Sequence, residues 1–494
     1  MTVAPTTGYV GSLSPKEEAS LREMWTLLFT TVTSLLSSVY EVKLPESSPN
    51  DIFKLLDKIT EPSIDGILAV LKNPPEANGE TASETTPNGA TIEQSLDKMK
   101  ELASKANGKE ILDKLSKTKL TQPQLSGLMT QLRKSHVNES EIKTIEKILL
   151  AMSPGEMIFT VLKLVKQEHP DTLLLRFLRA RKWDVPKAFG MMANAILWRQ
   201  KMQVDDDIVP KGELHAWQQS RDEKLSKAEQ KGGKDFISQL EMGKSYLHGL
   251  DREGRPVNVV RVRLHKPGAQ SEEALERYIV HVIESTRILV APPVETGTIL
   301  FDMTGFGLGN MEYSPVKFII QCFEANYPES LGRLLIHNAP WIFSGIWKII
   351  HGWMDPVVAS KVQFTKNIND LDKFIPRAHI PKELGGDQEF EYKYIEPSAD
   401  ENKAMQDKEK SDAVMVERMM IGLQLVAATA AWVSAADTAK SQEEKGAVEL
   451  LKKRRDTVIE EFRQNYWRLD PYVRARALID RTGALSPDGT VNNF

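Results

Sequence analysis

The stretch that decides the fold runs from Asn326 to Phe364 and reads NYPESLGRLLIHNAPWIFSGIWKIIHGWMDPVVASKVQF. The apolar run at 334–336 predicts a short buried strand, and residues 362–365 predict a second one. Between them, residues 342–354 place apolar side chains around most of the circumference of a helix, and three of the chain's nine tryptophans fall at 341, 347 and 353. The stretch therefore predicts two strands with an unusually aromatic helix between them.

The aromatic helix has two interpretations. It is either a well-buried helix packed on a sheet, or a hinged gate that covers an apolar cavity and dips into a bilayer, where indole rings are well placed. Pro340 and the pair Asp355-Pro356 interrupt the backbone at both ends, as a movable element requires. The candidate gate and pocket residues are Trp341, Ile342, Phe343, Ile346, Trp347, Ile350, Trp353 and Met354.

A lipid cargo would need such a cover. Two acyl chains carry about 30 methylenes, and at ~0.8 kcal/mol each their exposure to water would cost more than about 20 kcal/mol. An open groove does not retain a ligand of that kind in water.

The neighbouring sequence extends the pattern of strands and helices. After Arg255-Pro256, residues Val260, Val262 and Leu264 alternate with arginines and predict a strand with one wet face. TILFDM at 298–303 is apolar on both faces and predicts a central strand. Helices are expected over 272–290 and 314–325. This alternation predicts an α/β layer with a largely parallel sheet between about 240 and 388.

The rest of the chain predicts mainly helices. Pro15–Tyr40 has apolar residues at helical spacing, Asp171 is the expected N-cap of a helix over 172–182, and Asp184 that of a helix through Gln200. The expected segments are an N-terminal helical segment (1–40), a low-complexity linker (41–108), short helices (109–152), a helical domain (153–235), the α/β domain (236–390) and a C-terminal helical extension (400–494).

Composition and charge exclude several classes of protein. Lys+Arg total 64 against 68 Asp+Glu, a net charge of −4, which argues against a nucleic-acid-coating protein. The single cysteine, Cys322, cannot form an internal disulfide. The N-terminus shows no signal-peptide pattern, and the one long apolar stretch, 419–436, contains polar residues and is flanked closely by charges. We expect a soluble, cytoplasmic protein in which 419–436 is a packed helix rather than a membrane-surface helix or a span.

No pattern of catalytic or metal-binding residues is visible. The glycines at 305, 307 and 309 follow a strand, but the third glycine of a dinucleotide loop would fall at 310, which is Asn310. A turn that needs a positive φ explains them more simply. The nine histidines show no pair at metal-ligand spacing. We therefore expect no enzyme, no metal and no cofactor other than a bound lipid.

Seven motifs in fixed order resemble one family. They are LLLRFLRARKWDVPKA (173–188), LDREGRPV (250–257), FDMTG (301–305), NYPESLG (326–332), NAPWIF (338–343), MDPVVASK (354–361) and IPKELGG (380–386). Together they resemble the CRAL-TRIO lipid-binding family, and more narrowly its fungal phosphatidylinositol-transfer branch, including a subgroup associated with phosphatidylinositol and squalene. The resemblance covers about residues 150–390. It implies a lipid-binding α/β domain preceded by a small all-α domain.

The resemblance also implies a head-group site. In phosphatidylinositol-binding members, the residues matching Glu329 and Lys361 hold the inositol head group, and an arginine matching Arg181 supports the site. The chemistry is reasonable in itself, because a phosphodiester needs a cation and inositol hydroxyls need an acceptor. The alternative is that Glu329 and Lys361 form an ordinary ion pair and that Arg181 lies on a solvated helix face.

The same resemblance bears on a second ligand. Phosphatidylcholine carriers use hydroxyl side chains at two strand positions that match Gly297 and Ile299, which have none. A second, more hydrophobic lipid such as a sterol or squalene fits better. Some relatives bind haem, and His337 and Tyr313 lie in the matching region, although a hydrogen-bonded core histidine is the simpler interpretation.

The resulting functional expectation is a phosphatidylinositol carrier that exchanges this lipid for a second one. Its expected partners are phosphatidylinositol, a second hydrophobic lipid, a transiently contacted membrane surface and a phosphoinositide kinase, with no nucleic acid. It would be cytoplasmic, peripherally associated with intracellular membranes, and would support lipid homeostasis and vesicle trafficking. The alternatives are a sterol, squalene or haem carrier, and a helical interaction scaffold with a vestigial pocket.

Overall fold

The computed structural model describes residues 7–39, 122–134, 139–151 and 154–492. The predicted linker at 41–108 lies outside the described residues. The chain forms two compact units, one from residues up to Leu197 together with Lys408–Leu469, and the other from Trp198–Asp407 together with Asp470–Phe494. The segments expected from the sequence do not coincide with these two units, and that division of the chain stays a prediction.

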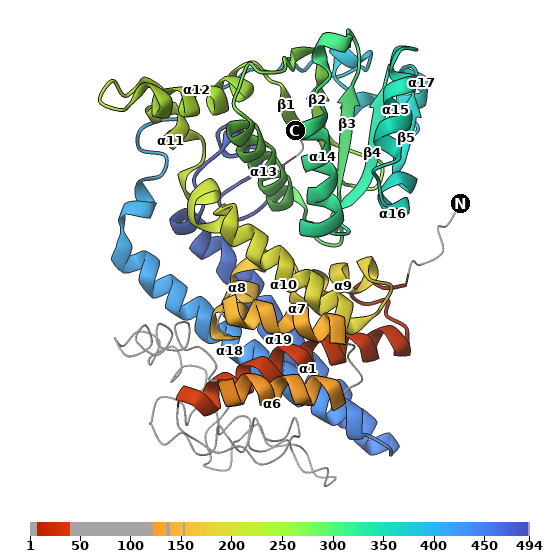
Figure 1. Cartoon of the computed structure of the whole chain (residues 1–494), viewed down its shortest axis with the longest axis vertical. Coiled ribbons are helices and arrows are strands. Elements are labelled where there is room, and N and C mark those ends of the chain that lie inside the picture. Colours follow the sequence, from red (N-terminus) through yellow and green to blue (C-terminus); the bar gives the residue numbers. More distant parts are fainter. Residues whose placement is uncertain (1–6, 40–121, 135–138, 152–153, 493–494) are drawn as a thin grey trace. The chain divides into compact units, whose positions relative to one another are not determined.

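The second unit contains a five-stranded sheet in the order β1-β2-β3-β4-β5 (Figure 1). The strands are β1 (Ser245–Leu250), β2 (Pro256–Arg261), β3 (Gly297–Asp302), β4 (Leu331–His337) and β5 (Val362–Thr365). β2 to β5 run parallel, and β1 is an antiparallel edge strand. The largely parallel sheet and the central position of TILFDM are thus confirmed.

One predicted strand boundary was wrong. β2 ends at Arg261, and Val262–Leu264 form a 3₁₀ turn instead of continuing the strand. Arg263 donates a hydrogen bond to Asp302 (2.7 Å), the last residue of β3, and the Asn310 amide donates to the main-chain oxygens of Arg263 and His265. These polar contacts turn the chain across the end of the sheet. The sequence gives no sign of this turn, because the alternation of apolar and charged residues continues through Leu264.

Helices pack against this sheet, and the sheet separates the core into two layers. These helices are α11 (Val209–Arg221), α12 (Lys227–Glu241), α13 (Glu272–Leu289), α14 (Tyr313–Gln321), α15 (Phe343–His351), α16 (Pro356–Ser360) and α17 (Ile368–Leu371). Ile299 and Ile336 belong to the core layer that contains α15, whereas Leu300 and Leu335 belong to the layer that contains Leu371 of α17. Alternate strand residues therefore enter different layers, as a central strand that is apolar on both faces requires.

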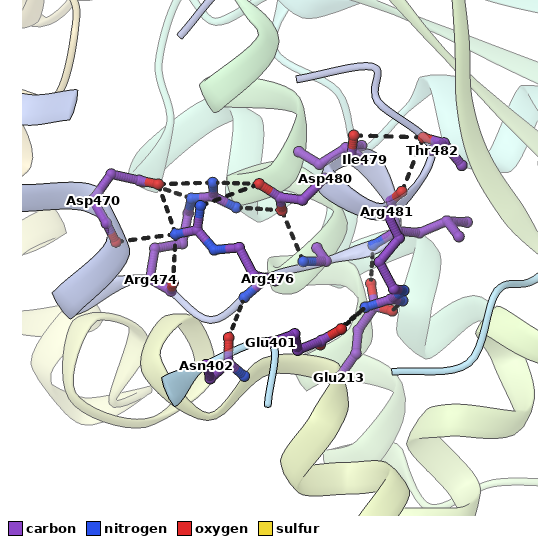
Figure 2. A network of polar contacts seen from close by, with 12 residues as sticks. Glu213, Glu401, Asn402, Asp470, Arg474, Arg476, Ile479, Asp480, Arg481 and Thr482 are labelled. Atoms are coloured by element: carbon purple, nitrogen blue, oxygen red, sulfur yellow. Dashed lines mark hydrogen bonds and ion pairs between the residues drawn. The ribbon is translucent and has the colours of Figure 1, made fainter. Parts of the chain in front are cut away.

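The C-terminal segment is held in this unit by a network of charges (Figure 2). Arg481, in α20 (Leu478–Arg481), forms ion pairs with Glu213 of α11 and with Glu401. Arg474 bridges Asp470 and Asp480 at 2.7 and 2.8 Å. Residues after 470 therefore belong to the sheet-containing unit.

The first unit is all helical. It contains α1 (Pro15–Val39), α6 (Gln122–Lys134), α7 (Glu139–Ala151), α8 (Pro154–Leu164), α9 (Pro170–Ala180), α10 (Val185–Lys201, to Leu197), α18 (Lys408–Thr438) and α19 (Gln442–Val473, to Leu469). Their apolar faces share one core, which includes Trp25 and Trp432.

Asp171 does not have the capping role that the sequence suggested. The N-cap of α9 is His169, whose side chain accepts a hydrogen bond from the Asp171 main-chain nitrogen. Asp171 is buried in the first turn, where it accepts a hydrogen bond from the Trp25 indole (2.8 Å) and pairs with Arg455 of α19. Its carboxylate joins three helices of this unit.

α18 is the one helix in the described part of the chain that is long and apolar enough to span a membrane by length and composition. Within its most apolar stretch of 18 residues, half is buried inside the protein. Arg418 of α18 is 1% exposed, its guanidinium lies 3.8 Å from the Phe462 ring, and it donates to the main-chain oxygen of Phe462 (2.8 Å). These contacts are those of a packed core helix.

Candidate functional site

An apolar cavity lies on one face of the sheet in the second unit. It encloses about 1310 Å³ of empty space, part of it open to solvent. Its walls come from β2, β3 and β4, from α13 and α14, and from α15. The apolar lining includes Val260, Ile283, Ile299, Val316, Phe343 and Trp347. A cavity of this kind suits a ligand that is itself largely hydrocarbon.

The aromatic helix covers this cavity with one face and meets solvent with the other. Of the predicted gate and pocket residues, those that line the cavity are Phe343, Trp347, Ile350 and Met354. Ile346 is buried in the same cluster, and Ile342 and Trp353 pack against it partly buried. Trp341 is 86% exposed and does not line the cavity. The helix therefore packs on the sheet and lines the cavity, and its role as a hinged gate that enters a bilayer stays a prediction.

Glu329 and Lys361 lie side by side. Glu329 lies two residues before β4 and Lys361 immediately precedes β5, and these neighbouring parallel strands begin at the same edge of the sheet. Lys361 Nζ is 3.1 Å from Glu329 Oε2, and each side chain is 18% exposed. The Lys361 carbonyl oxygen accepts a hydrogen bond from the Leu334 nitrogen (3.0 Å), and Leu334 lines the cavity. The pair is thus connected to the cavity wall through one main-chain hydrogen bond.

A buried polar cluster holds the turn that presents Glu329. The Tyr327 hydroxyl donates to Glu284 (2.8 Å), and the Arg199 guanidinium donates both to Glu284 (2.7 Å) and to the Tyr327 oxygen (3.2 Å). Burial and the nearby Glu284 carboxylate raise the pKa of Tyr327 well above its usual value, so the phenol stays protonated. Glu329 itself has φ +54°, a backbone conformation that residues other than glycine rarely adopt.

Sequence reasoning missed Arg199 and Glu284. No short motif links them, because they are 85 residues apart and meet only when α13 packs against the last residues of α10. The available signal was weak: both are charged residues within otherwise apolar helical patterns.

Arg181, the third predicted head-group residue, belongs to the helical unit. It is the half-buried C-cap residue of α9, and its guanidinium donates to the Ala180 carbonyl oxygen (3.2 Å). Its proposed role beside Glu329 and Lys361 stays a prediction from the resemblance.

The residues considered for other ligands have clear positions. His337 is 5% exposed, and its Nδ1 lies 2.9 Å from the Thr365 hydroxyl, as expected of a hydrogen-bonded core histidine. Tyr313 packs edge-on against Trp353 at 5.3 Å between ring centroids. Ile299 lines the cavity and brings no hydroxyl to it. Gly305 has φ +74°, which agrees with the turn predicted for the glycine-rich stretch.

Over the described ranges, no group of three or more His, Cys, Asp or Glu side chains is arranged to hold a metal ion.

Fold and site together define a lipid-binding protein of the CRAL-TRIO class, and comparison with known proteins agrees. Residues 240–386 match the CRAL/TRIO domain and residues 109–194 match the CRAL/TRIO N-terminal domain. The chain is 42% identical over 323 residues to the phosphatidylinositol transfer protein CSR1 of Eremothecium gossypii, covering 65% of this chain and 70% of the relative. It therefore belongs to the CRAL-TRIO family.

Two further relatives place the chain within the family. A CRAL-TRIO domain-containing protein of Schizosaccharomyces pombe, C3H8.02, is 38% identical over 346 residues, 70% of this chain and 72% of the relative. The phosphatidylinositol/phosphatidylcholine transfer protein SFH12 of Arabidopsis thaliana is 26% identical over 242 residues, 45% of this chain and 41% of the relative. The predicted resemblance to fungal members is confirmed, and relatives named for phosphatidylinositol transfer support a lipid-transfer role in this family.

Proposed function

We propose that this protein extracts phosphatidylinositol from a membrane, carries it with its acyl chains in the apolar cavity, and exchanges it for a second hydrophobic lipid. The observation that supports this best is the Glu329–Lys361 pair, 3.1 Å apart where β4 and β5 begin, because the Lys361 main chain is hydrogen-bonded to Leu334 of the cavity wall. Lys361 supplies a cation for the phosphodiester, and Glu329 supplies acceptors for inositol hydroxyls. No covalent step is needed.

The exposed side of the gate supports a membrane step. Trp341, Ile349, Val357 and Phe364 are large apolar residues that are 44–86% exposed, and all lie on or next to α15, α16 and β5. Burying such side chains in a bilayer interface is favourable and would place the gate against its lipid source. We propose that the protein works in the cytoplasm, binds intracellular membranes peripherally, presents phosphatidylinositol to a phosphoinositide kinase, and so supports lipid homeostasis and trafficking.

The test is phosphatidylinositol transfer between vesicles by the Glu329→Ala, Lys361→Ala double variant. Removing charge-assisted hydrogen bonds to the head group costs about 1.5–3 kcal/mol each, so we expect the loss of both to lower transfer by about a hundredfold or more. The matched control is Asp370→Ala with Lys373→Ala, an ion pair of 2.8 Å on α17 and the residues after it. This control should transfer like the wild type.

Two outcomes would contradict the proposal. Unchanged transfer by the Glu329 and Lys361 double variant would remove these residues from the head-group site. No transfer by the wild-type chain, with no lipid detected by mass spectrometry of the purified protein, would favour the scaffold alternative.

A further inference from the structure

The cavity has a polar end that the head-group pair does not account for. Glu329 and Lys361 lie where β4 and β5 begin, whereas Lys244, His265 and Glu312 lie beyond the opposite, carboxyl ends of β2 and β3. Lys244 joins this edge because β1 is antiparallel, and its carbonyl oxygen accepts from the nitrogen of Arg261, the last residue of β2. All three side chains line the cavity. In open α/β sheets the carboxyl edge is the usual place for a ligand.

The Lys244 ammonium is buried and fully hydrogen-bonded. It is 5% exposed and contacts Gln239 Oε1 (3.1 Å), Gln270 Oε1 (3.0 Å) and His265 Nδ1 (3.4 Å). Because an ammonium only donates, Nδ1 of His265 accepts, and the ring proton lies on Nε2, which donates to Glu312 (2.9 Å). Three acceptors use all three ammonium protons. The hydrogen-bonded chain from Lys244 through His265 to Glu312, called the relay below, holds one cation and one carboxylate, so its net charge is zero.

The same cavity contains a polar side chain with a free donor. Asn258, in the middle of β2, is 7% exposed and lines the cavity together with Ser245. The Ser245 hydroxyl donates to Asn258 Oδ1 (2.5 Å). None of the described residues accepts a hydrogen bond from the Asn258 amide nitrogen, and Glu312 has a second carboxylate oxygen that none of them engages. This end of the cavity therefore offers one unused donor and one unused acceptor.

From this arrangement we infer that the polar end binds the hydroxyl group of a neutral, otherwise apolar lipid. The Asn258 amide donates to the hydroxyl oxygen, and Glu312 is the acceptor available for the hydroxyl proton. This inference rests on the proposed function, since it names the class of the second lipid.

Two other classes of ligand fit this polar end less well. A pure hydrocarbon leaves the Asn258 donor unsatisfied in an apolar cavity, which is costly. A carboxylate or phosphate would meet Glu312 and an ammonium whose protons are all in use, so it would add a buried charge without a matching donor.

A chain-matched set of probes tests the inference. The lipid-free full chain is equilibrated with phosphatidylcholine vesicles that contain hexadecan-1-ol, hexadecane or hexadecanoic acid at equal mole fraction, and the bound probe is measured. In Asn258→Leu, which is close in shape, we expect the alcohol-to-hydrocarbon binding ratio to fall about tenfold. Glu312→Gln should lower the same ratio by less and serves as a second variant. Asn369→Leu, on α17, is the control and should keep the wild-type ratio.

The outcomes separate this inference from the proposed function. An unchanged ratio in folded Asn258→Leu and Glu312→Gln would overturn the hydroxyl site, and so would preferential binding of hexadecanoate that is lost in Asn258→Leu. Phosphatidylinositol transfer is measured on the same samples. Its absence in the wild type would refute the proposed function while leaving a fall in the ratio as support for the polar end.

Discussion

Tyr327 connects the core of the sheet-containing unit to the Glu329–Lys361 ion pair. Its phenol is buried between Glu284 and Arg199, and two residues later the chain takes the left-handed conformation of Glu329. Such a conformation costs about 1–3 kcal/mol and persists only where its surroundings hold it. We interpret Tyr327 as a positioning residue for Glu329.

Tyr327→Phe should lower the free energy of unfolding by about 1–2 kcal/mol, because it leaves Glu284 and Arg199 without one buried hydrogen-bond partner. Urea unfolding measures this change. Tyr313→Phe is the control, since Tyr313 is 38% exposed, and it should shift stability by less than about 0.5 kcal/mol. Equal effects of the two substitutions would contradict the importance of the buried cluster.

At this scale the sequence predicted contacts only between residues that flank strands it had predicted. Glu329 and Lys361 each flank a predicted strand, so adjacent parallel strands bring them together, as the structure shows. Lys244, His265 and Glu312 also meet at strand ends, but β1 was not predicted and nothing marked Lys244 as buried. Without β1, the carboxyl edge of the sheet could not be assembled from sequence alone.

At the scale of elements, α15 has two different sides in one short helix. Its inner side chains line the cavity, while Ile349 is 48% exposed and Trp341, just before the helix, is 86% exposed. The sequence predicted the apolar character of the helix but not which side chains face outward, because apolar residues occupy most of its circumference. α18 is similar: its apolar length allowed three interpretations, and the buried Arg418 contacts identify a packed helix.

The exposed indole of Trp341 gives a prediction for the gate. Trp341→Ser should slow lipid exchange with vesicles by about tenfold, because an interfacial indole contributes about 1–2 kcal/mol to membrane binding, and it should leave unfolding unchanged. Leu450→Ser removes a 52% exposed apolar side chain from α19 and is the control. If both variants exchange lipid at the same rate, Trp341 has no special role at the membrane.

At the scale of the whole molecule, each unit has a buried carboxylate whose pKa is strongly lowered. Burial alone would raise the pKa of Asp171, but the Arg455 charge outweighs it and lowers this pKa to about 2. Burial also opposes the shift of Glu213, where hydrogen bonding to His281 and the Arg481 charge lower the pKa to about 2. Asp171 joins helices within the first unit. Glu213 holds the C-terminal segment within the second unit (Figure 2).

The two carboxylates predict how the protein responds to acid. Their folded pKa values lie below the ordinary 3.8 and 4.5, so their stabilisation is complete above those ordinary values and is lost as the pH falls toward about 2. Each shift corresponds to about 2–3 kcal/mol. Urea unfolding at a series of pH values from 7 to 3 measures the loss. Asp171→Asn and Glu213→Gln should each be less stable than the wild type at pH 7, yet lose less stability on acidification, because the group that titrates has been removed. Variants whose stability fell with acid as steeply as that of the wild type would show that other groups control the acid response.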